Sequence, residues 1–190
     1  MEVSLQIQHV AKTDVGKVRS ANEDNHGHAE YYWGQVFLVC DGMGGHVGGA
    51  KASQIAVSSI LEFFARDRAE NPVSSLEKAI QFANEQIYAT SLSQPALKGM
   101  GTTCVVVMQK ETGLWIAHVG DSRAYIYTDG KLFKLSRDHS FVQRLVDQGT
   151  IDEEDAELHP RKNELTRALG IKVDVEVEVT VDPIFPKNGD

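Results

Sequence analysis

The sequence of 190 residues lacks several features that mark other classes of protein. It has no apolar run of membrane-spanning length, and its start, MEVSLQIQHV, lacks the basic residues and hydrophobic stretch of a signal peptide. Acidic residues outnumber basic ones, so the formal net charge is -8. The sequence also has no basic stripe that would suggest a nucleic-acid partner. The only two cysteines, Cys40 and Cys104, lie in apolar runs and make no disulfide framework. We therefore expect a reduced, cytoplasmic protein.

Internal repeats and low-complexity linkers are also absent. A chain that is 42% hydrophobic can bury a substantial core, which predicts one domain over residues 1–190. Apolar residues alternate at 3–7, run continuously at 36–40 (VFLVC) and recur at helical spacing from 52 to 64. The patterns predict a half-buried strand, a buried strand and a helix that begins near His46 or Val47. A capping-box signal at Ser74 and Glu77 predicts a second helix.

After Gly99 the pattern is typical of strands. The runs TTCVVVMQ, LWIAHVG, RAYIYT and KLFKLS follow one another through short turns, and such tight connections predict antiparallel pairing. Short helices are expected at 140–148 and 152–158. Valines alternate strictly with polar residues at 173–181, which predicts one strand with one wet face. Helices before and between runs of antiparallel strands indicate an α+β domain rather than a doubly wound sheet.

One acidic residue, Asp41, stands where the buried strand meets a glycine-rich segment, VCDGMGGHVGG. A dinucleotide fingerprint fails because Val47 occupies the third glycine position. A calcium loop of the EF-hand type fails because its alternating acids are absent. What remains is a strand-to-helix turn where backbone can approach a ligand closely and a carboxylate points at it. A hard cation fits that description.

One carboxylate holds a divalent ion weakly, so other acids at strand ends are candidates. The segment RSANEDN contains Arg19, Glu23 and Asp24, and the segment HVGDSRAY places Asp121 in a tight turn. Taken separately, Glu23 and Asp24 are typical of a solvated loop, and Asp121 is typical of an ordinary turn. Because all of these acids fall at strand ends, as Asp41 does, we expect them to converge.

Read in order, six motifs resemble those of the metal-dependent protein serine/threonine phosphatases of the type 2C class, in their bacterial form. The motifs are RSANEDN, DGMGGHVGG, GTT, VGDSRAY, LSRDHS and LTRALG, and the resemblance runs from about Asp14 to the end of the chain. It implies a four-layer α-β-β-α sandwich of two antiparallel sheets flanked by helices. It also implies hydrolysis of phosphoserine and phosphothreonine on proteins by a metal-activated water at a dinuclear Mn²⁺ or Mg²⁺ site.

The same resemblance assigns roles to individual acids. Asp41 would bridge the two ions, while Glu23 and the carbonyl of Gly42 would serve one of them. Asp24 would hold water on the metal. Asp121 matches a position that helps to bind a third, looser ion. Hard cations such as Mg²⁺ and Mn²⁺ prefer oxygen ligands of this kind.

Two further residues have expected roles in substrate chemistry. Arg19 matches the residue that grips the substrate phosphate, and its planar fork of donors can bind two oxygens together. His46 is the best candidate for the proton donor to the leaving group, and the alternative is that it caps or packs the helix start. The eukaryotic motif has histidine where Met43 stands, which leaves the donor open. His118 lies inside an apolar strand and is expected to be a core histidine.

Residues 136–169 match the flap of this family, a variable surface segment that influences substrate access. The alternative is an ordinary connection with two short helices. The partners implied are phosphorylated proteins and a bacterial serine/threonine kinase with its targets.

Two motifs of the family are missing from the sequence, namely Ser-Asp-Gly and Gly-x-Asp-Asn, whose aspartates complete the metal site. The expectation is therefore a catalytic domain that is C-terminally incomplete, has negligible activity by itself and tends to associate. The alternative is a non-catalytic regulatory or scaffolding module.

Overall fold

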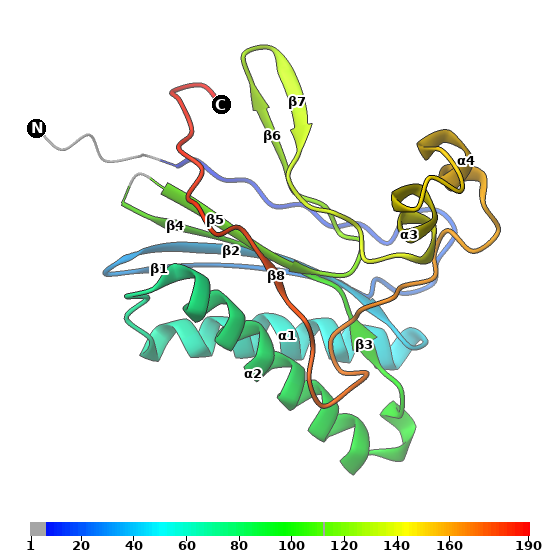
Figure 1. The fold of residues 1–190 in the computed structure, drawn as a ribbon. Helices are drawn as coiled ribbons and strands as arrows, with labels where there is room; N and C mark the ends of the chain where they lie inside the picture. The colour runs from blue at the N-terminus through cyan, green and yellow to red at the C-terminus, as the bar shows by residue number, and fades with distance from the viewer. Residues whose placement is uncertain (1–6, 112) are drawn as a thin grey trace, which may run out of the picture.

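The computed structural model describes residues 7–111 and 113–190, apart from the side chain of His46. Its main element is an antiparallel sheet in which the strands follow the order β1-β2-β4-β5-β8, with β3 pairing to β2. Two long helices cover one face of this sheet, and a separate two-stranded ribbon, β6-β7, stands on the other side (Figure 1). The α+β class is confirmed. The strand expected at 3–7 falls almost entirely outside the described residues.

Two strands and two long helices come first in the chain, and a run of strands follows them, as the sequence patterns predict. The long helices are α1 (His46–Arg66) and α2 (Pro72–Ser93), followed by a short 3-10 turn, η1 (Pro95–Leu97). Segment 136–169, which the sequence predicts to be a flap, contains α3 (Phe141–Asp147) and α4 (Glu153–Leu158). The strands are β1 (Asp24–Tyr31), β2 (Gly34–Met43), β3 (Gly101–Thr102), β4 (Cys104–Lys110), β5 (Gly113–Val119), β6 (Tyr125–Thr128), β7 (Lys131–Lys134) and β8 (Glu178–Val179).

The core lies between the sheet and the two long helices. In β2, Val36, Leu38 and Cys40 are at most 3% exposed and face the helices, whereas Val39 between them is 47% exposed on the open face. This period of two is that of a strand with one buried face. Both cysteines are free and buried, as expected. The helices add fully buried side chains to the same core: Ala52, Ala56, Ile60, Phe64, Leu76, Ile80, Ala83 and Ile87.

The start of α1 at His46 confirms the prediction from spacing, but α2 begins earlier than the capping-box signal suggested. The side chain of Asn71 accepts a hydrogen bond from the backbone N–H of Ser74, at 3.0 Å. Pro72 occupies the first turn, where its missing N–H costs nothing. Ser74 therefore lies inside α2, and Asn71 is the N-cap of the helix.

The prediction of one strand over 173–181 is wrong, because only β8 pairs with β5. Side chains of α2 take backbone groups at the start of this segment instead: Asn84 donates to the Val173 carbonyl at 2.8 Å, and Gln81 accepts the Val175 N–H at 3.3 Å. The alternation still reports burial, because alternate valines pack against the core: Val175, Val177 and Val179.

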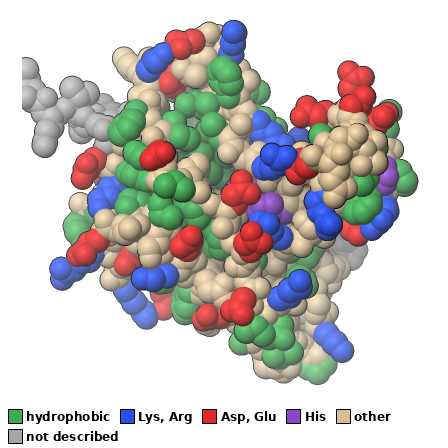
Figure 2. All heavy atoms as spheres, viewed as in Figure 1, with side chains coloured by type: hydrophobic (Ala, Val, Ile, Leu, Met, Phe, Trp, Pro, Cys, Tyr) green, Lys and Arg blue, Asp and Glu red, His purple; other side chains and the backbone are tan. Residues whose placement is uncertain are grey.

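The predicted pairing of RAYIYT with the strand before it is also wrong. β6 pairs only with β7, in a separate two-stranded sheet. The chain leaves the main sheet at Gly120, whose φ of 103° lies in the region that favours glycine. The ribbon stands over the open face of the sheet, and hydrophobic side chains gather on the surface beneath it (Figure 2). An apolar cleft of about 820 Å³ lies there, with Ile116, Ile126 and Ile184 in its wall.

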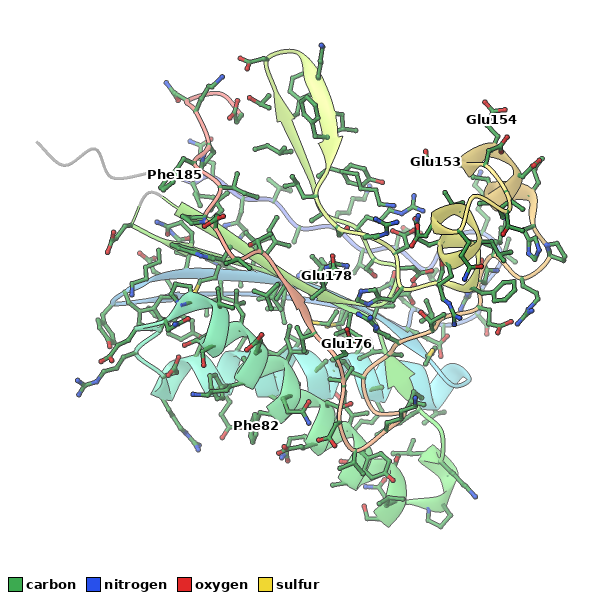
Figure 3. The ribbon with its side chains drawn as sticks, viewed as in Figure 1. Phe82, Glu153, Glu154, Glu176, Glu178 and Phe185 are labelled. Atoms are coloured by element: carbon green, nitrogen blue, oxygen red, sulfur yellow. The ribbon has the colours of Figure 1, made fainter. Side chains whose placement is uncertain are left out.

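Both short helices of the flap are confirmed. Ser140 caps α3 and Asp152 caps α4, each by accepting a backbone N–H three residues on. The pair lies at one end of the molecule, and Figure 3 marks Glu153 and Glu154 on α4 there. Among the described helices, none combines the length and apolar character needed to cross a membrane.

Candidate metal and phosphate site

The strand register brings two carboxylates together at one end of the sheet. Asp24, the first residue of β1, pairs directly with Asp41 of β2. Side chains opposite each other in an antiparallel pair have Cβ atoms about 4.5–5.5 Å apart, and like charges in that position repel. Asp41 lies within β2, which continues to Met43, so the prediction that it sits on the turn itself is wrong by a few residues.

The electrostatics of this end of the sheet favour a cation. Burial, followed by the charges of Asp24 and Asp121, raises the pKa of Asp41 to about 6, and Arg19 only partly offsets this. Burial and the charge of Asp138 raise the pKa of Asp121 as well. The acids therefore lie close enough to oppose one another's ionisation, and a bound cation would relieve that repulsion.

Glu23 supplies a second sign that a cation fits here. Its side chain is only 7% exposed, and Oε2 accepts a hydrogen bond from Nη1 of Arg19 at 3.2 Å. Oε1 is buried and has no hydrogen-bond partner among the described residues. Leaving a buried carboxylate oxygen unpaired is costly, and a divalent ion would satisfy it.

The glycines of the DGMGGHVGG motif make room for this carboxylate. A Cβ on Gly49 would lie 2.5 Å from Oε1 of Glu23. A Cβ on Gly42 would overlap the carbonyl oxygen of Gly49 and lie 2.7 Å from that of Glu23. The backbone N–H of Gly42 donates to the Glu23 carbonyl at 3.2 Å. These glycines are needed for close approach of strand, helix and the segment that carries Glu23.

The GTT motif holds Asp41 in place, a role that the sequence interpretation missed. Thr103 donates its backbone N–H to the Asp41 carbonyl, and its hydroxyl accepts the Asp41 N–H, both at 2.9 Å. Thr102 adds a hydroxyl bond to the same carbonyl, at 2.9 Å. The Thr103 hydroxyl also bonds that of Ser122 at 2.6 Å, which joins the Asp41 strand to the turn that carries Asp121. The only sequence signal for this role is that the hydroxyl residues of GTT and GDS lie close to a glycine.

Two clefts are lined by these acids, and Arg123 lies in the wall of both. A smaller one, of about 390 Å³, lies over the carboxylate pair, and its wall includes three residues that the sequence interpretation did not single out: Lys12, Ser122 and Arg123. A larger one, of about 810 Å³, runs from Asp121 to the flap helices α3 and α4. Ser122 and Arg123 could have been found from the GDSR run, whereas no local signal marks Lys12.

The structure thus brings together the acids that the sequence nominated, with Arg19 and Gly42 beside them. His46 begins α1 directly after the turn at Gly44 and Gly45, but its side chain is outside the described part of the chain, so its role as a donor stays a prediction. His118 is confirmed as a core histidine, since it is 3% exposed and its Nε2 bonds the Arg137 carbonyl at 2.7 Å.

Comparison with known proteins agrees with this geometry. The family described as Protein phosphatase 2C matches residues 16–168. The serine/threonine phosphatase stp of Listeria monocytogenes is 42% identical over 177 residues, which cover 90% of this chain and 70% of that protein. The crystal structure of the serine/threonine phosphatase Stp1 from Staphylococcus aureus superposes with a TM-score of 0.87 at 35% identity, covering 95% of this chain and 72% of that one.

A further crystal structure, of the catalytic domain of the serine/threonine protein phosphatase PstP, holds two manganese ions. It matches 89% of this chain and 70% of that one, with a TM-score of 0.74 and 33% identity. The family model spans most of the sequence, and the fold and the order of the acidic motifs agree with it. The chain belongs to the protein phosphatase 2C family.

Proposed function

We propose that this chain, in a domain that also carries the Ser-Asp-Gly and Gly-x-Asp-Asn motifs of the family, hydrolyses phosphoserine and phosphothreonine of proteins at a site for two divalent ions, Mn²⁺ or Mg²⁺. The observation that carries the proposal is the buried, unpartnered oxygen of Glu23 beside the Asp24–Asp41 pair. The serine/threonine phosphatases among its relatives, and the two manganese ions of the PstP structure, support it.

The donor set suits two hard cations. Asp41 would serve both ions, Glu23 and the Gly42 carbonyl would hold one of them, and Asp24, which pairs with Asp41 across the strands, would hold water on the metal. Asp121, across the cleft, suits a third and looser ion. When bound, such ions neutralise phosphate charge and lower the pKa of a coordinated water towards 7.

Arg19 is proposed to bind the substrate phosphate. Its side chain is 66% exposed, and its one ion pair, with Glu23, leaves most of the guanidinium fork unused among the described residues. A doubly charged phosphate monoester can accept two parallel bonds from that fork. Arg19 would thus orient the phosphorus towards the carboxylate pair, without taking part in bond cleavage.

The cleft between Asp121 and the flap helices offers the phosphoprotein chain a place to lie. Its volume exceeds what the phosphate group needs, and its wall carries both signs of charge, including Lys134, Lys162 and Glu157. The proposed substrates are the targets of a bacterial serine/threonine kinase, and a cytoplasmic location stays a prediction. The rival hypothesis is a module that binds phosphoproteins without cleaving them.

The decisive experiment joins the chain to a segment that carries the two missing motifs and measures phosphate release from a phosphothreonine peptide with and without Mn²⁺. Hydrolysis that requires the metal supports the proposal. Binding of the peptide in the presence of Mn²⁺, without release of phosphate, would favour the non-catalytic module.

Replacing Arg19 by alanine should raise KM for a phosphopeptide by about 10- to 100-fold and change kcat much less, because a charge-assisted hydrogen bond contributes about 1.5–3 kcal/mol. Steady-state kinetics of the domain that contains the two missing motifs, at saturating Mn²⁺, measure this. Lys17→Ala, which removes the same charge from the same exposed segment, is the matched control and should leave KM unchanged. Equal effects of both variants would assign Arg19 only a general electrostatic role.

Replacing His46 by alanine should lower kcat for an alkyl phosphate, whose leaving group needs a proton, by about 10²-fold. With nitrophenyl phosphate the leaving group is acidic and the loss should nearly vanish. The ratio of the two kcat effects is the measurement. Equal losses on both substrates would show that His46 caps or packs the start of α1.

A further inference from the structure

Both backbone groups of Gly120, the residue before Asp121, are held by one histidine. The backbone N–H of His139 donates to the Gly120 carbonyl at 2.9 Å, and the Gly120 N–H donates to Nδ1 of the His139 ring at 3.1 Å. Gly120 also packs closely on Thr103, because a Cβ at Gly120 would lie 2.6 Å from Cγ2 of Thr103 and no side chain fits there. The direction in which the chain enters Asp121 is therefore set from the flap side.

The ring of His139 is held in one tautomer. The residue is 6% exposed, and burial lowers its pKa although the hydrogen bond to Glu178 opposes this. A neutral ring has one donor and one acceptor, and Nδ1 is the acceptor for Gly120. Nε2 therefore carries the proton and donates it to Oε2 of Glu178 at 3.2 Å. Figure 3 marks Glu178 on β8, so the C-terminal part of the sheet fixes the tautomer.

A metal ion is the obvious alternative occupant of this cluster. Ligand atoms of His118, His139 and Glu178 lie within 4.8 Å of one another. Neither nitrogen of His139 is free for an ion, because one accepts from Gly120 and the other carries the proton. A guanidinium nitrogen of Arg167 also lies 3.2 Å from Nε2. With Nε2 protonated this is a close approach of two donors and not a hydrogen bond, and its positive charge further disfavours a cation there. The cluster is therefore a chain of hydrogen bonds from Gly120 through His139 to Glu178, and not a metal site.

The other side of Asp121 is held independently. Ser122 bonds Thr103 through their hydroxyls, and Thr103 holds the backbone of Asp41 on both its N–H and its carbonyl. Asp121 is therefore bracketed between a residue tied to Asp41 and a residue tied to His139. Its distance from Asp41 depends on both ties.

His139 also bonds a residue near the end of the flap. The His139 carbonyl accepts the backbone N–H of Thr166 at 2.8 Å, so the start and the end of segment 136–169 meet at this residue. We propose that His139 is a positioning residue, which fixes the Gly120–Asp121 turn from the base of the flap and so sets the geometry of the Asp121 carboxylate for a divalent ion. This rests on the metal site of the proposed function.

Two substitutions separate positioning from packing. In His139→Asn the side-chain oxygen takes the place of Nδ1 and can still accept from Gly120. In His139→Gln the polar end reaches the place of Nε2 and can still contact Glu178, but the Gly120 N–H loses its acceptor. Asparagine leaves the larger void, so a residue that mattered only for packing would tolerate glutamine better. Positioning predicts the opposite order.

The first measurement is amide hydrogen exchange at Gly120, which needs no metal. The second is Mn²⁺ affinity of the full chain, followed by electron paramagnetic resonance of free Mn²⁺. His139→Asn should keep Gly120 protected and stay within about threefold of the parent affinity. His139→Gln should lose the protection and weaken the looser Mn²⁺ site by about 10- to 100-fold, as is usual when support of a ligand is removed.

Equal Mn²⁺ affinities for the two variants would overturn the proposal, as would a larger loss in His139→Asn. Loss of Gly120 protection without any change in affinity would also overturn it. A parent chain that binds no Mn²⁺ at all would defeat the metal site of the proposed function itself, and the inference with it. Because that outcome is seen before any variant is made, the two failures are distinguishable.

Discussion

In a domain that also carries the Ser-Asp-Gly and Gly-x-Asp-Asn motifs, replacing Asp41 by asparagine should lower Mn²⁺-dependent turnover of a phosphopeptide by about 10²- to 10³-fold, with the protein still folded. The size is that of removing one preorganised group that stabilises charge in a transition state. Asparagine keeps the shape of the side chain and the backbone bonds to Thr102 and Thr103, but it removes the negative charge from between the two proposed ion positions. Kinetics at a series of Mn²⁺ concentrations measure both the loss and any shift in metal dependence.

The same variant should be more stable than the parent when no metal is present. The pKa of Asp41 is raised from its ordinary 3.8 to about 6, so the folded state holds this proton more tightly than the unfolded state does. Its contribution to stability is full below about pH 4 and is lost as the pH rises through 6. Asparagine has no such loss. Because the side chain is partly exposed, we expect a gain of only about 1 kcal/mol at pH 7.

Urea unfolding in EDTA at pH 4 and pH 7 measures this gain. Glu30→Gln, which removes an exposed acid from the same strand as Asp24, is the control and should change neither turnover nor the pH dependence. A folded Asp41→Asn protein with near-normal turnover at limiting Mn²⁺ would refute the proposed role. A variant less stable than the parent at both pH values would refute the electrostatic account.

The local parts of this structure follow from sequence patterns because burial has a period. The run VFLVC and the spacing after His46 report which residues face the core, and the structure has β2 and α1 there. The acidic motifs could be brought to one site because each lies at a strand end. The cross-strand pairing of Asp24 with Asp41 adds the register that the sequence does not state.

The parts that could not be predicted depend on contacts between distant segments. At 173–181 the alternation of valines is real, but the backbone bonds go to Asn84 and Gln81 of α2, about 90 residues earlier. The unpartnered oxygen of Glu23 is visible only when Gly42 and Gly49 are packed around it. The two hydrogen bonds between His139 and Gly120 likewise join the motifs LSRDHS and VGDSRAY. The spacing of these motifs in the sequence does not predict those bonds.

The second large effect concerns Gly42. A methyl group at Gly42 would overlap the carbonyl oxygen of Gly49 in α1 and crowd the carbonyl of Glu23, and both are backbone atoms that cannot rotate away. We expect Gly42→Ala to lower the free energy of unfolding by about 3 kcal/mol or more, at the upper end of overpacking costs. The helix and the Glu23 segment must move apart, so Mn²⁺ affinity should fall as well.

Gly27→Ala is the matched control for Gly42→Ala, because Gly27 also lies in a strand and a Cβ there would meet only side-chain methyl groups, 2.7 Å from Val57 and 3.0 Å from Leu38. Those groups can shift, so the cost should be about 1 kcal/mol and Mn²⁺ affinity should not change. Urea unfolding and Mn²⁺ titration of both variants make the comparison. If both alanines cost the same and Gly42→Ala still binds Mn²⁺ as the parent does, the close approach of β2 to α1 is not what holds Glu23 at the site.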